Sequence, residues 1–308
     1  MAKGNMLLGM SRGSVGDVTF YRSGGSQRAR ARNRKPANPM TVRQQTQRAK
    51  FANAVKFHKQ VTSNFFRFAY EDKKVNESDY NAFMRHNVGN SGYIGAKASK
   101  IASWPALGLW EVTAGSLPEI QYVSAGDNPG FIFDIGVSSS TITTIGALSS
   151  ALIAHGDTWR EGDIVTVLLY SATVADGLPT VDTDTEHIAS SGYMQFVLNS
   201  TDTTLLVNVQ CIVNSFGFGV SVTADGLVVT SSDSDFAGSW SGDLYQCAVI
   251  HSRNTAGGLL VSTQSMVANN DTVIANALSE EGTYYNAMLA DWDAAAEAVL
   301  QGAAAANQ

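Results

Sequence analysis

Arginine occupies every second position from residue 28 to residue 34, in a segment that reads RARARNR and is followed by Lys35. In an extended chain, a repeat of two residues places these side chains on one face at intervals of about 6.5 Å. That spacing is close to the distance between phosphates in an extended nucleic-acid strand. Arginine offers a planar fork of N–H donors to phosphate oxygens and keeps its charge at every relevant pH. The segment therefore predicts a strand that binds a polyanion.

Other cations lie on both sides of this segment. The full set of candidate nucleic-acid-binding residues is Arg22, Arg28, Arg30, Arg32, Arg34, Lys35, Arg43, Arg48 and Lys50. No zinc-finger or helix-turn-helix pattern accompanies them, so we expect phosphate contacts without base recognition, and single-stranded DNA as a non-specific partner. An acidic protein surface, such as a capsid interior, would suit the same cations, and the sequence leaves this alternative open.

The charges are separated along the chain. Residues 1–60 contain 13 Lys or Arg and one acid, Asp17, which gives a formal charge of +12. From residue 101 onward, Arg160 and Arg253 are the only two basic residues against 22 acids, which gives −20. A split of this kind is typical of a basic arm attached to a body that negative charge keeps in solution.

Motifs of catalysis and cofactor binding are not found in the sequence. There is no GxxxxGK[ST], GxSxG or HExxH pattern. The five histidines fall in different predicted elements: His58, His86, His155, His187 and His251. Cys211 and Cys247 have no CxxC partner, which leaves buried free thiols or one disulfide across two sheets as the alternatives. We expect no enzymatic activity and no cofactor.

One acidic segment has side chains that suit a hard cation. The sequence VDTDTEH contains Asp182, Asp184, Glu186 and His187, and carboxylates are the usual ligands of such ions. The segment lacks the glycine and the terminal glutamate of an EF-hand loop. A solvated acidic turn between strands explains it equally well, so no metal site is predicted.

The elements that must position these residues fall into four parts. Residues 1–40 form the basic extended arm, in which Val15 to Tyr21 predicts a short strand. Residues 41–116 form a helical segment and a linker. Thr41 is the expected N-cap of a helix over about 42–70, and its apolar stripe is predicted to contain Phe51, Val55, Phe65 and Ala69.

A second helix is expected to follow Asn76 and to end before Gly89. Its predicted apolar side contains Tyr80, Phe83 and Met84. Residues 96–114 are predicted to be a linker that docks Trp104 and Trp110 on the body.

Residues 117–278 form the predicted β-rich body. Short runs rich in Val, Ile, Thr and Tyr are separated by Gly, Asp, Asn and Ser, and cover residues 164–170, 193–198, 205–213, 227–230, 244–251 and 259–266. This spacing predicts an antiparallel sandwich or barrel. Residues 279–308 predict a helix with Tyr284, Met288 and Trp292 on one side, followed by an Ala-rich tail. The fold class is therefore α+β.

The chain has no run of 18 apolar residues, and its beginning is too polar for a signal peptide. We expect no membrane partner and synthesis in a host cytoplasm.

The N-terminal motifs resemble those of a known group of proteins. They are RGSVGD at residues 12–17, RARNRKPANP at residues 30–39 and QRAKF at residues 47–51, continued by NFFRFAYEDKKVNESDYNAFMRHN at residues 64–87. Over roughly the first ninety residues, the chain is similar to uncharacterised structural-type proteins of small, microvirus-like gut bacteriophages and of related bacterial elements. The resemblance implies a place in a virion, with capsid or other virion subunits as partners and a homo-oligomeric state.

Three functions are compatible with these features. The first is a bacteriophage virion structural protein whose arm binds packaged nucleic acid or the capsid interior, while the acidic body makes decoration or spike-like assembly contacts. The second is a protein-protein connector that donates a strand and does not contact nucleic acid. The third is a carbohydrate-binding surface protein that uses Trp159, Tyr193 and Trp240.

Overall fold

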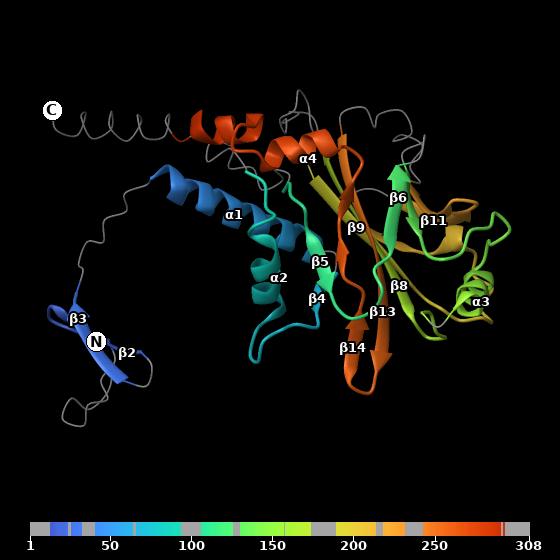
Figure 1. The fold of residues 1–308 in the computed structure, drawn as a ribbon, viewed down its shortest axis with the longest axis horizontal. Coiled ribbons are helices and arrows are strands. Elements are labelled where there is room, and N and C mark those ends of the chain that lie inside the picture. Colours follow the sequence, from blue (N-terminus) through green and yellow to red (C-terminus); the bar gives the residue numbers. More distant parts are fainter. Residues whose placement is uncertain are drawn as a thin grey trace. The chain divides into compact units, whose positions relative to one another are not determined.

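The computed structural model describes residues 13–23, 26–32, 41–63, 66–93, 106–125, 130–156, 158–173, 189–213, 218–231, 243–290 and 292. The chain divides into two compact units, residues 1–44 and residues 45–308 (Figure 1). Among the described residues, no helix is both long enough and apolar enough to span a bilayer.

The first unit contains a three-stranded antiparallel sheet. Its order is β1 (Gly13–Val15), β2 (Val18–Ser23) and β3 (Ser26–Ala31). Gly16, with φ of +56°, and Asp17 form the tight turn between β1 and β2, as expected for a two-residue hairpin loop. The strand expected over Val15 to Tyr21 is therefore interrupted by a turn. The described residues of the arm form a small sheet and not one extended strand.

The central sheet of the second unit has the order β10 (Cys211–Val213), β9 (Ala189–Val197), β8 (Ile164–Thr173), β13 (Asp243–Thr255) and β14 (Gly258–Val261). The short strand β16 (Val267–Ala268) also pairs with β13. Successive residues of β8 and β13 enter different hydrophobic clusters, since Leu168 and Tyr170 pack on one face while Val167 and Leu169 pack on the other. Burial on both faces explains why these strands read as continuous apolar runs.

A second sheet covers one face of the central sheet. It has the order β11 (Phe218–Thr223), β12 (Gly226–Ser231), β7 (Gly130–Asp134) and β6 (Gln121–Ala125). Together with helix α3 (Ile145–His155), it closes a cluster that includes Phe131, Phe133 and Leu148. At the turn between β11 and β12, Gly226 has φ of +129°, and a Cβ there would collide with the carbonyl of Phe133.

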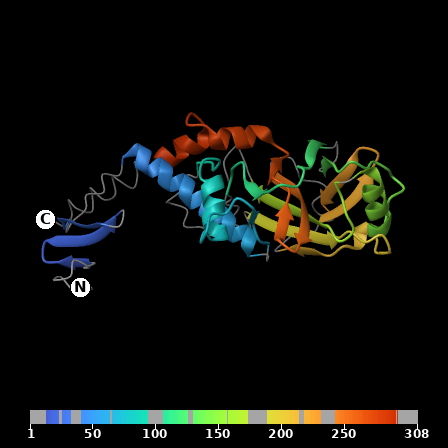
Figure 2. The same cartoon turned by 60° about the horizontal axis from the view of Figure 1, so that its bottom comes forward.

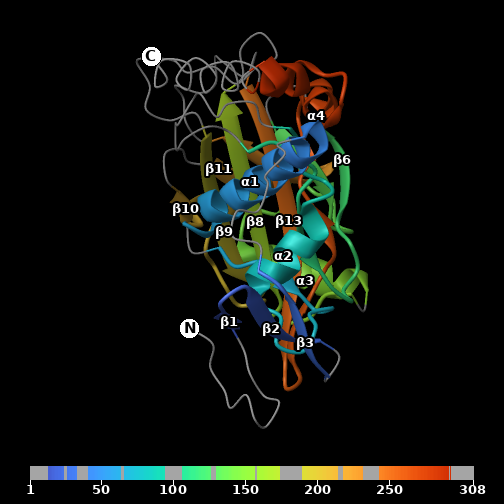
Figure 3. The ribbon, with the colours of Figure 1, turned by 90° about the vertical axis from the view of Figure 1, so that its left-hand side faces the viewer.

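Helices cover the opposite face of the central sheet (Figure 2). They are α1 (Val42–Thr62), α2 (Asp79–Asn87), α4 (Asp271–Leu278) and a helical stretch at residues 283–290. Figure 3 looks onto α1 and α2 with the strands of the central sheet behind them. A small sheet of β15 (Gln264–Ser265), β5 (Glu111–Ala114) and β4 (Ala69–Tyr70) adjoins this layer, and its β4–β5 pair is parallel. The 3₁₀ turn η2 (Leu206–Asn208) precedes β10.

The architecture confirms the predicted α+β class with a sandwich-like body, and it is not a closed barrel. The helical segment and the β-rich body share one hydrophobic cluster, because Phe57, Phe83 and Trp110 pack with Tyr170 and Ala248. The expected boundary at residue 116 therefore does not coincide with a break in packing.

Helix α1 differs from its prediction in length and in its buried face. Thr41 accepts a hydrogen bond from the Gln44 amide at 3.4 Å, as an N-cap does, but the helix ends at Thr62 and not near residue 70. Phe51 was predicted to be on the buried stripe, yet it is 50% exposed. The buried face instead contains Asn53, Ala54, Phe57 and Val61, with Thr46.

The hydrogen bonds of Asn53 explain why α1 buries a face that contains polar residues. Its amide nitrogen donates hydrogen bonds to the carbonyls of Leu107 at 2.6 Å and Gly92 at 3.1 Å and to the Ser91 hydroxyl at 3.0 Å. A buried polar side chain whose donors are satisfied by backbone carbonyls and a hydroxyl can replace an apolar residue in a packed face. A search for apolar periodicity alone therefore selects the wrong side of this helix.

The other predicted elements agree with the structure to different degrees. Helix α2 begins after Ser78, whose hydroxyl accepts from the Asn81 amide, and it buries Phe83 and Met84 as expected. The run at residues 205–213 contains η2 and only the short strand β10. Within the expected linker at residues 96–114, residues 111–114 form β5 and Trp110 is buried, whereas Trp104 lies outside the described residues. The C-terminal region is helical, with Tyr284 and Met288 buried.

Both cysteines are free thiols in strands. Burial raises the pKa of Cys211 to about 12 and that of Cys247 well above its ordinary value. Neither thiol is a thiolate nucleophile at neutral pH.

Candidate functional site

The sheet of the first unit has two chemically different faces. In the β2–β3 register, Arg28 lies opposite Tyr21 and Arg30 lies opposite Thr19, while Phe20 lies opposite Ala29. Because side chains alternate across a strand, Arg28 and Arg30 share one face with Thr19 and Tyr21. Val15, Val18, Phe20, Ala29 and Ala31 share the other face. The sheet is amphipathic, with one basic face and one apolar face.

The basic face presents charges to solvent. Arg28, Arg30 and Arg32 are exposed, and the Arg30 guanidinium lies 5.6 Å from the centre of the Tyr21 ring. Such a cation–π contact orients the guanidinium without neutralising it. Within the described part of the chain, no carboxylate forms an ion pair with these three arginines. Of the predicted alternation of arginines, Arg28 and Arg30 are therefore present in β3, and Arg32 follows the strand.

The remaining predicted cations are not all equivalent. Arg22 lies in β2, but only its backbone is described, and Arg34 and Lys35 lie outside the described residues. Arg43 and Arg48 are exposed on α1. The Lys50 ammonium lies 4.8 Å from the centre of the Tyr93 ring and is half-buried. Lys50 thus packs on Tyr93 within the second unit and does not extend freely toward a partner.

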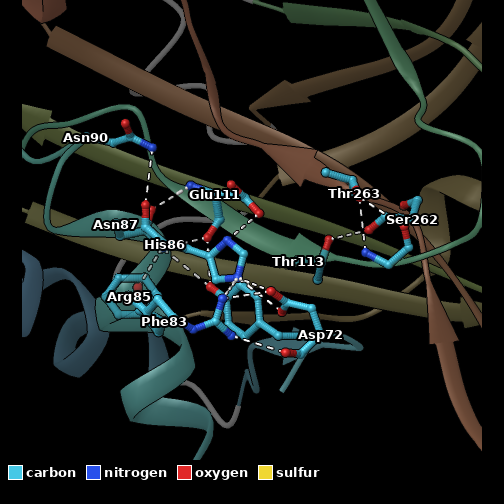
Figure 4. Close-up of polar contacts among 12 residues, drawn as sticks. Asp72, Phe83, Arg85, His86, Asn87, Asn90, Glu111, Thr113, Ser262 and Thr263 are labelled. Carbon is cyan, nitrogen blue, oxygen red and sulfur yellow. Dashed lines mark hydrogen bonds and ion pairs between the residues drawn. The ribbon is translucent and has the colours of Figure 1, made fainter. Parts of the chain in front are cut away.

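A polar cluster joins α2 to β5 in the second unit (Figure 4). Arg85 donates to Asp72 at 2.7 Å and to Glu77 at 3.1 Å. The two ring nitrogens of His86 lie 3.1 Å from Asp72 and 2.8 Å from Glu111. The bonds from Arg85 and His86 outweigh partial burial and hold the pKa of Asp72 at about 2.

Neighbouring residues complete this cluster. The Asn87 amide nitrogen donates to the Glu111 carbonyl at 2.8 Å, and its amide oxygen accepts from the Glu111 amide at 2.7 Å. The Tyr70 ring stacks on His86 with 4.7 Å between ring centres. The members therefore satisfy one another and fix α2 on β5, which is a structural role.

A second polar cluster was not predicted from the sequence. Asp163 is 1% exposed and lies just before β8. Arg253 on β13 donates to it from Nε and from Nη2, each at 2.7 Å. His251 Nε2 lies 2.7 Å from Oδ2 of the same carboxylate, the oxygen that also accepts from Arg253 Nη2, and the Arg160 amide donates to Oδ2 at 2.9 Å. One buried carboxylate thus holds an arginine and a histidine from the neighbouring strand.

His251 is further enclosed by Trp159, whose ring stacks on the imidazole with 4.0 Å between ring centres. Burial lowers the pKa of His251, and this outweighs the raising effect of Asp163. The imidazole is therefore neutral at neutral pH. Because ionised Asp163 only accepts hydrogen bonds, His251 Nε2 carries the hydrogen, and Nδ1 carries a lone pair.

The residues proposed for carbohydrate binding do not form an open aromatic platform. Trp159 is buried against His251, and Tyr193 is half-buried against Phe66 with 6.0 Å between ring centres. Trp240 lies outside the described residues, as do Asp182, Asp184, Glu186 and His187 of the acidic segment. No cluster of three metal-ligating side chains occurs among the residues that the structure describes.

Residues 10–127 match a family of unknown function, DUF6266. The match covers the basic arm and most of the helical layer, and it ends before β7. It spans less than half of the chain. Comparisons with curated proteins and with solved structures found no match.

Proposed function

We propose that this chain is a structural subunit of a bacteriophage-type virion, in which the sheet of residues 13–31 binds packaged nucleic acid and the β-rich unit makes assembly contacts. The proposal rests on the basic face of β3. Arg28 and Arg30 lie on it side by side with Thr19 and Tyr21, without a carboxylate in register. No catalytic role is included in the proposal.

The distribution of charge supports nucleic-acid binding by the first unit and protein contacts by the second. Residues 1–44 contain nine Lys or Arg and one acid, a formal charge of +8, whereas residues 45–308 contain 12 Lys or Arg and 26 acids, a charge of −14. A nucleic acid is attracted to the first unit and repelled by the net charge of the second. Binding is therefore restricted to the arm, and the body stays available for protein contacts.

The chemistry of the face suits a flexible single strand. Guanidinium groups bind phosphate oxygens in a geometry that does not depend on base identity. Tyr21 is 38% exposed beside Arg30, and aromatic rings of this kind stack on unpaired bases of any sequence. We therefore expect single-stranded DNA to bind without sequence preference.

The test compares the full-length protein with the variant Arg28→Gln, Arg30→Gln, Arg32→Gln. The logarithm of the affinity for a mixed-sequence DNA oligonucleotide should fall linearly with the logarithm of salt concentration, by about 0.7 per phosphate neutralised. Removing three arginines should reduce this slope by about 2 and weaken binding at low salt at least about tenfold. Fluorescence anisotropy at several salt concentrations measures both quantities.

A matched control removes the same charge elsewhere. Lys59, Lys74 and Arg160 are exposed cations of the second unit, and their joint change to Gln alters the net charge equally. The control should retain the wild-type slope. An equal loss in both variants would show a general charge effect and contradict a specific role of β3.

The apolar face of the sheet favours a second candidate, the protein-protein connector. Val15 is 46% exposed and Val18 is 38% exposed, and no residue of this sheet belongs to either described hydrophobic cluster. Unpaired apolar surface of this kind marks a contact site. If the arginine variant binds DNA as the wild type does but no longer joins particles, the connector is the correct function.

A further inference from the structure

The helical layer leaves one end of the central sheet uncovered, where the β13–β14 hairpin extends beyond α1 and α2 (Figure 1, Figure 3). Because side chains alternate along a strand, this end continues the face on which Leu168 and Ile250 pack against the helices. None of the residues that the strand register places there is charged, and they include Ile164, Thr166, Gln195, Val197, Leu259 and Val261. We call this surface the open sheet end.

The open sheet end combines exposed apolar side chains with a hollow. Val197 is 49% exposed and Leu259 is 46% exposed. The hollow has a volume of about 270 Å³, and Phe66, Tyr193 and Leu259 are among its lining residues. A cavity of about 150 Å³ is enough for a benzene ring. The hollow therefore has room for one aromatic side chain from a partner.

The apolar face of the first unit offers such a side chain. Phe20 lies in the central strand β2, opposite Gly13 on β1 and Ala29 on β3. Gly13 and Ala29 have no side-chain atom beyond Cβ, so Phe20 is the largest side chain at the centre of this face. A small three-stranded sheet gains stability by covering its hydrophobic face, and no described hydrophobic cluster includes this one. The face therefore needs a partner surface.

Charge decides which surface can be that partner. The first unit carries +8 and the second unit carries −14. Two first units repel each other, as do two second units, whereas a first unit and a second unit attract. The apolar face of the first unit therefore fits the open sheet end of the second unit better than it fits another copy of itself.

The reach of the chain favours a second copy as the source of the first unit. The Ser191 hydroxyl on β9 donates to the Gln60 carbonyl at 2.9 Å, so the C-terminal end of α1 lies beside the strand that leads to the open sheet end. Helix α1 has 21 residues and is about 30 Å long. The chain from Ala31 to the start of α1 spans at most about 36–40 Å. Within one chain, this contact would require a nearly fully extended connection, whereas a second copy has no such restriction.

We propose that the apolar face of residues 13–31 of one copy packs on the open sheet end of a second copy, with Phe20 in the hollow. The inference rests on the proposed structural role and names the partner of the first unit. Two sheets packed in this way lie about 10 Å apart, and the basic face of β3 stays on the outer side, where nucleic acid binds. The contact joins two different surfaces, so successive copies form a ring or an open chain.

Disulfide cross-linking between two full-length chains tests the contact. One chain carries Val18→Cys on the apolar face, and the other carries Leu259→Cys at the open sheet end. Both also carry Cys211→Ser, while Cys247 stays because it is fully buried. Each chain then has one reactive thiol, so no disulfide can form within a chain. With oxidised glutathione, the mixed dimer should form at least about tenfold faster than in the controls, because a specific contact raises the effective thiol concentration.

Two controls match the cross-linked pair. Tyr21→Cys places the thiol on the basic face of the same strand, and Val75→Cys places it at another exposed apolar position of the second unit. Tyr21→Cys with Leu259→Cys, and Val18→Cys with Val75→Cys, should form mixed dimers only slowly. Equal rates in all three pairs would contradict the proposal. Predominance of the Val18→Cys homodimer would show that the first units pair with each other instead.

A charge variant tests the same contact without cysteines. Leu259→Lys places a cation opposite the basic first unit and should weaken self-association, measured by sedimentation velocity, at least about tenfold. Leu205→Lys, at another exposed leucine of the second unit, should associate as the wild type does. An equal loss in both variants, or none in Leu259→Lys, would overturn the proposal.

DNA binding by Leu259→Lys separates this inference from the proposed function. Its affinity for the DNA oligonucleotide should match that of the wild type, because the basic face of β3 is not part of the contact. A protein that cross-links as expected but does not bind DNA would support the contact and contradict nucleic-acid binding. A protein that binds DNA without the cross-link would overturn the contact alone.

Discussion

Replacing Phe57 by Ala is expected to lower the free energy of unfolding of the second unit by about 3–5 kcal/mol, the usual cost of removing a fully buried aromatic ring. Phe57 is 0% exposed on α1. Its ring stacks on Trp110 with 4.4 Å between centres and also meets Phe83 and Tyr170. Truncation leaves a cavity at the point where the helical layer contacts the central sheet.

Phe51→Ala is the matched control on the same helix. Phe51 is 50% exposed, so its truncation should change the free energy of unfolding by no more than about 0.5 kcal/mol. Urea titrations followed by far-UV circular dichroism measure both variants against the wild type. Equal losses, or a larger loss for Phe51→Ala, would show that α1 packs through the face that apolar periodicity indicates.

Helix α1 shows which features of an element a sequence pattern can predict. Its start at Thr41 was predictable because a hydroxyl before a helical run satisfies free amides. Its buried face was not, because Asn53 and Thr46 are polar and an apolar stripe passes over them. The burial of Asn53 is explained by its donation to the carbonyls of Gly92 and Leu107, which lie 39 and 54 positions further along the chain.

The strands were more readily predicted than the layers. Apolar runs located β8, β9, β12 and β13 with only small errors at their ends. Helix α3 was missed, although its N-cap Thr144 is a recognisable signal, because its sequence is small and apolar without a polar face. The continuous apolar runs of β8 and β13 agree with burial on both faces, but no local pattern encodes which layers cover those faces.

The two candidate sites also differ in how far they could be predicted from the sequence. The alternation of arginines in β3 is a local pattern, so its one-sided face was predictable, whereas the opposing apolar face needed the β2–β3 register. Asp163 is separated by 88 residues from His251 and by 90 from Arg253. Pairing of Ser252 with Ile164 brings the three together. Lone residues at such separations carry no signal that a single sequence reveals.

Changing Asp163 to Asn is expected to destabilise the second unit by about 3–5 kcal/mol at pH 7, the typical cost of removing one partner of a buried ion pair. The Asn amide would place N–H donors against those of Arg253 or His251, and the Arg253 charge would lose its partner. Asp225→Asn, in an exposed turn, is the control and should be neutral within about 0.5 kcal/mol. Urea titrations measure both.

The pH dependence gives a second test of the same cluster. Burial tends to raise the pKa of Asp163, but the bonds from Arg253 and His251 outweigh it and hold the pKa below its ordinary value. A depressed folded-state pKa gives stability that is present above the unfolded value of about 3.9 and is lost as the pH falls through the folded value. The pKa of His251 is also lowered, so its protonation in the unfolded chain removes stability as the pH falls below about 6.5.

Both groups therefore make the wild-type unit less stable toward acid. The wild type loses the stabilising contribution of the Asp163 carboxylate as the pH falls below about 4, whereas Asp163→Asn has no such contribution to lose. The difference in unfolding free energy between variant and wild type should therefore narrow as the pH falls. Urea titrations at intervals between pH 8 and pH 3 measure this difference, with Asp225→Asn as the reference. A constant difference across the whole range would mean that Asp163 does not stabilise the fold as a carboxylate, and that its role is packing alone.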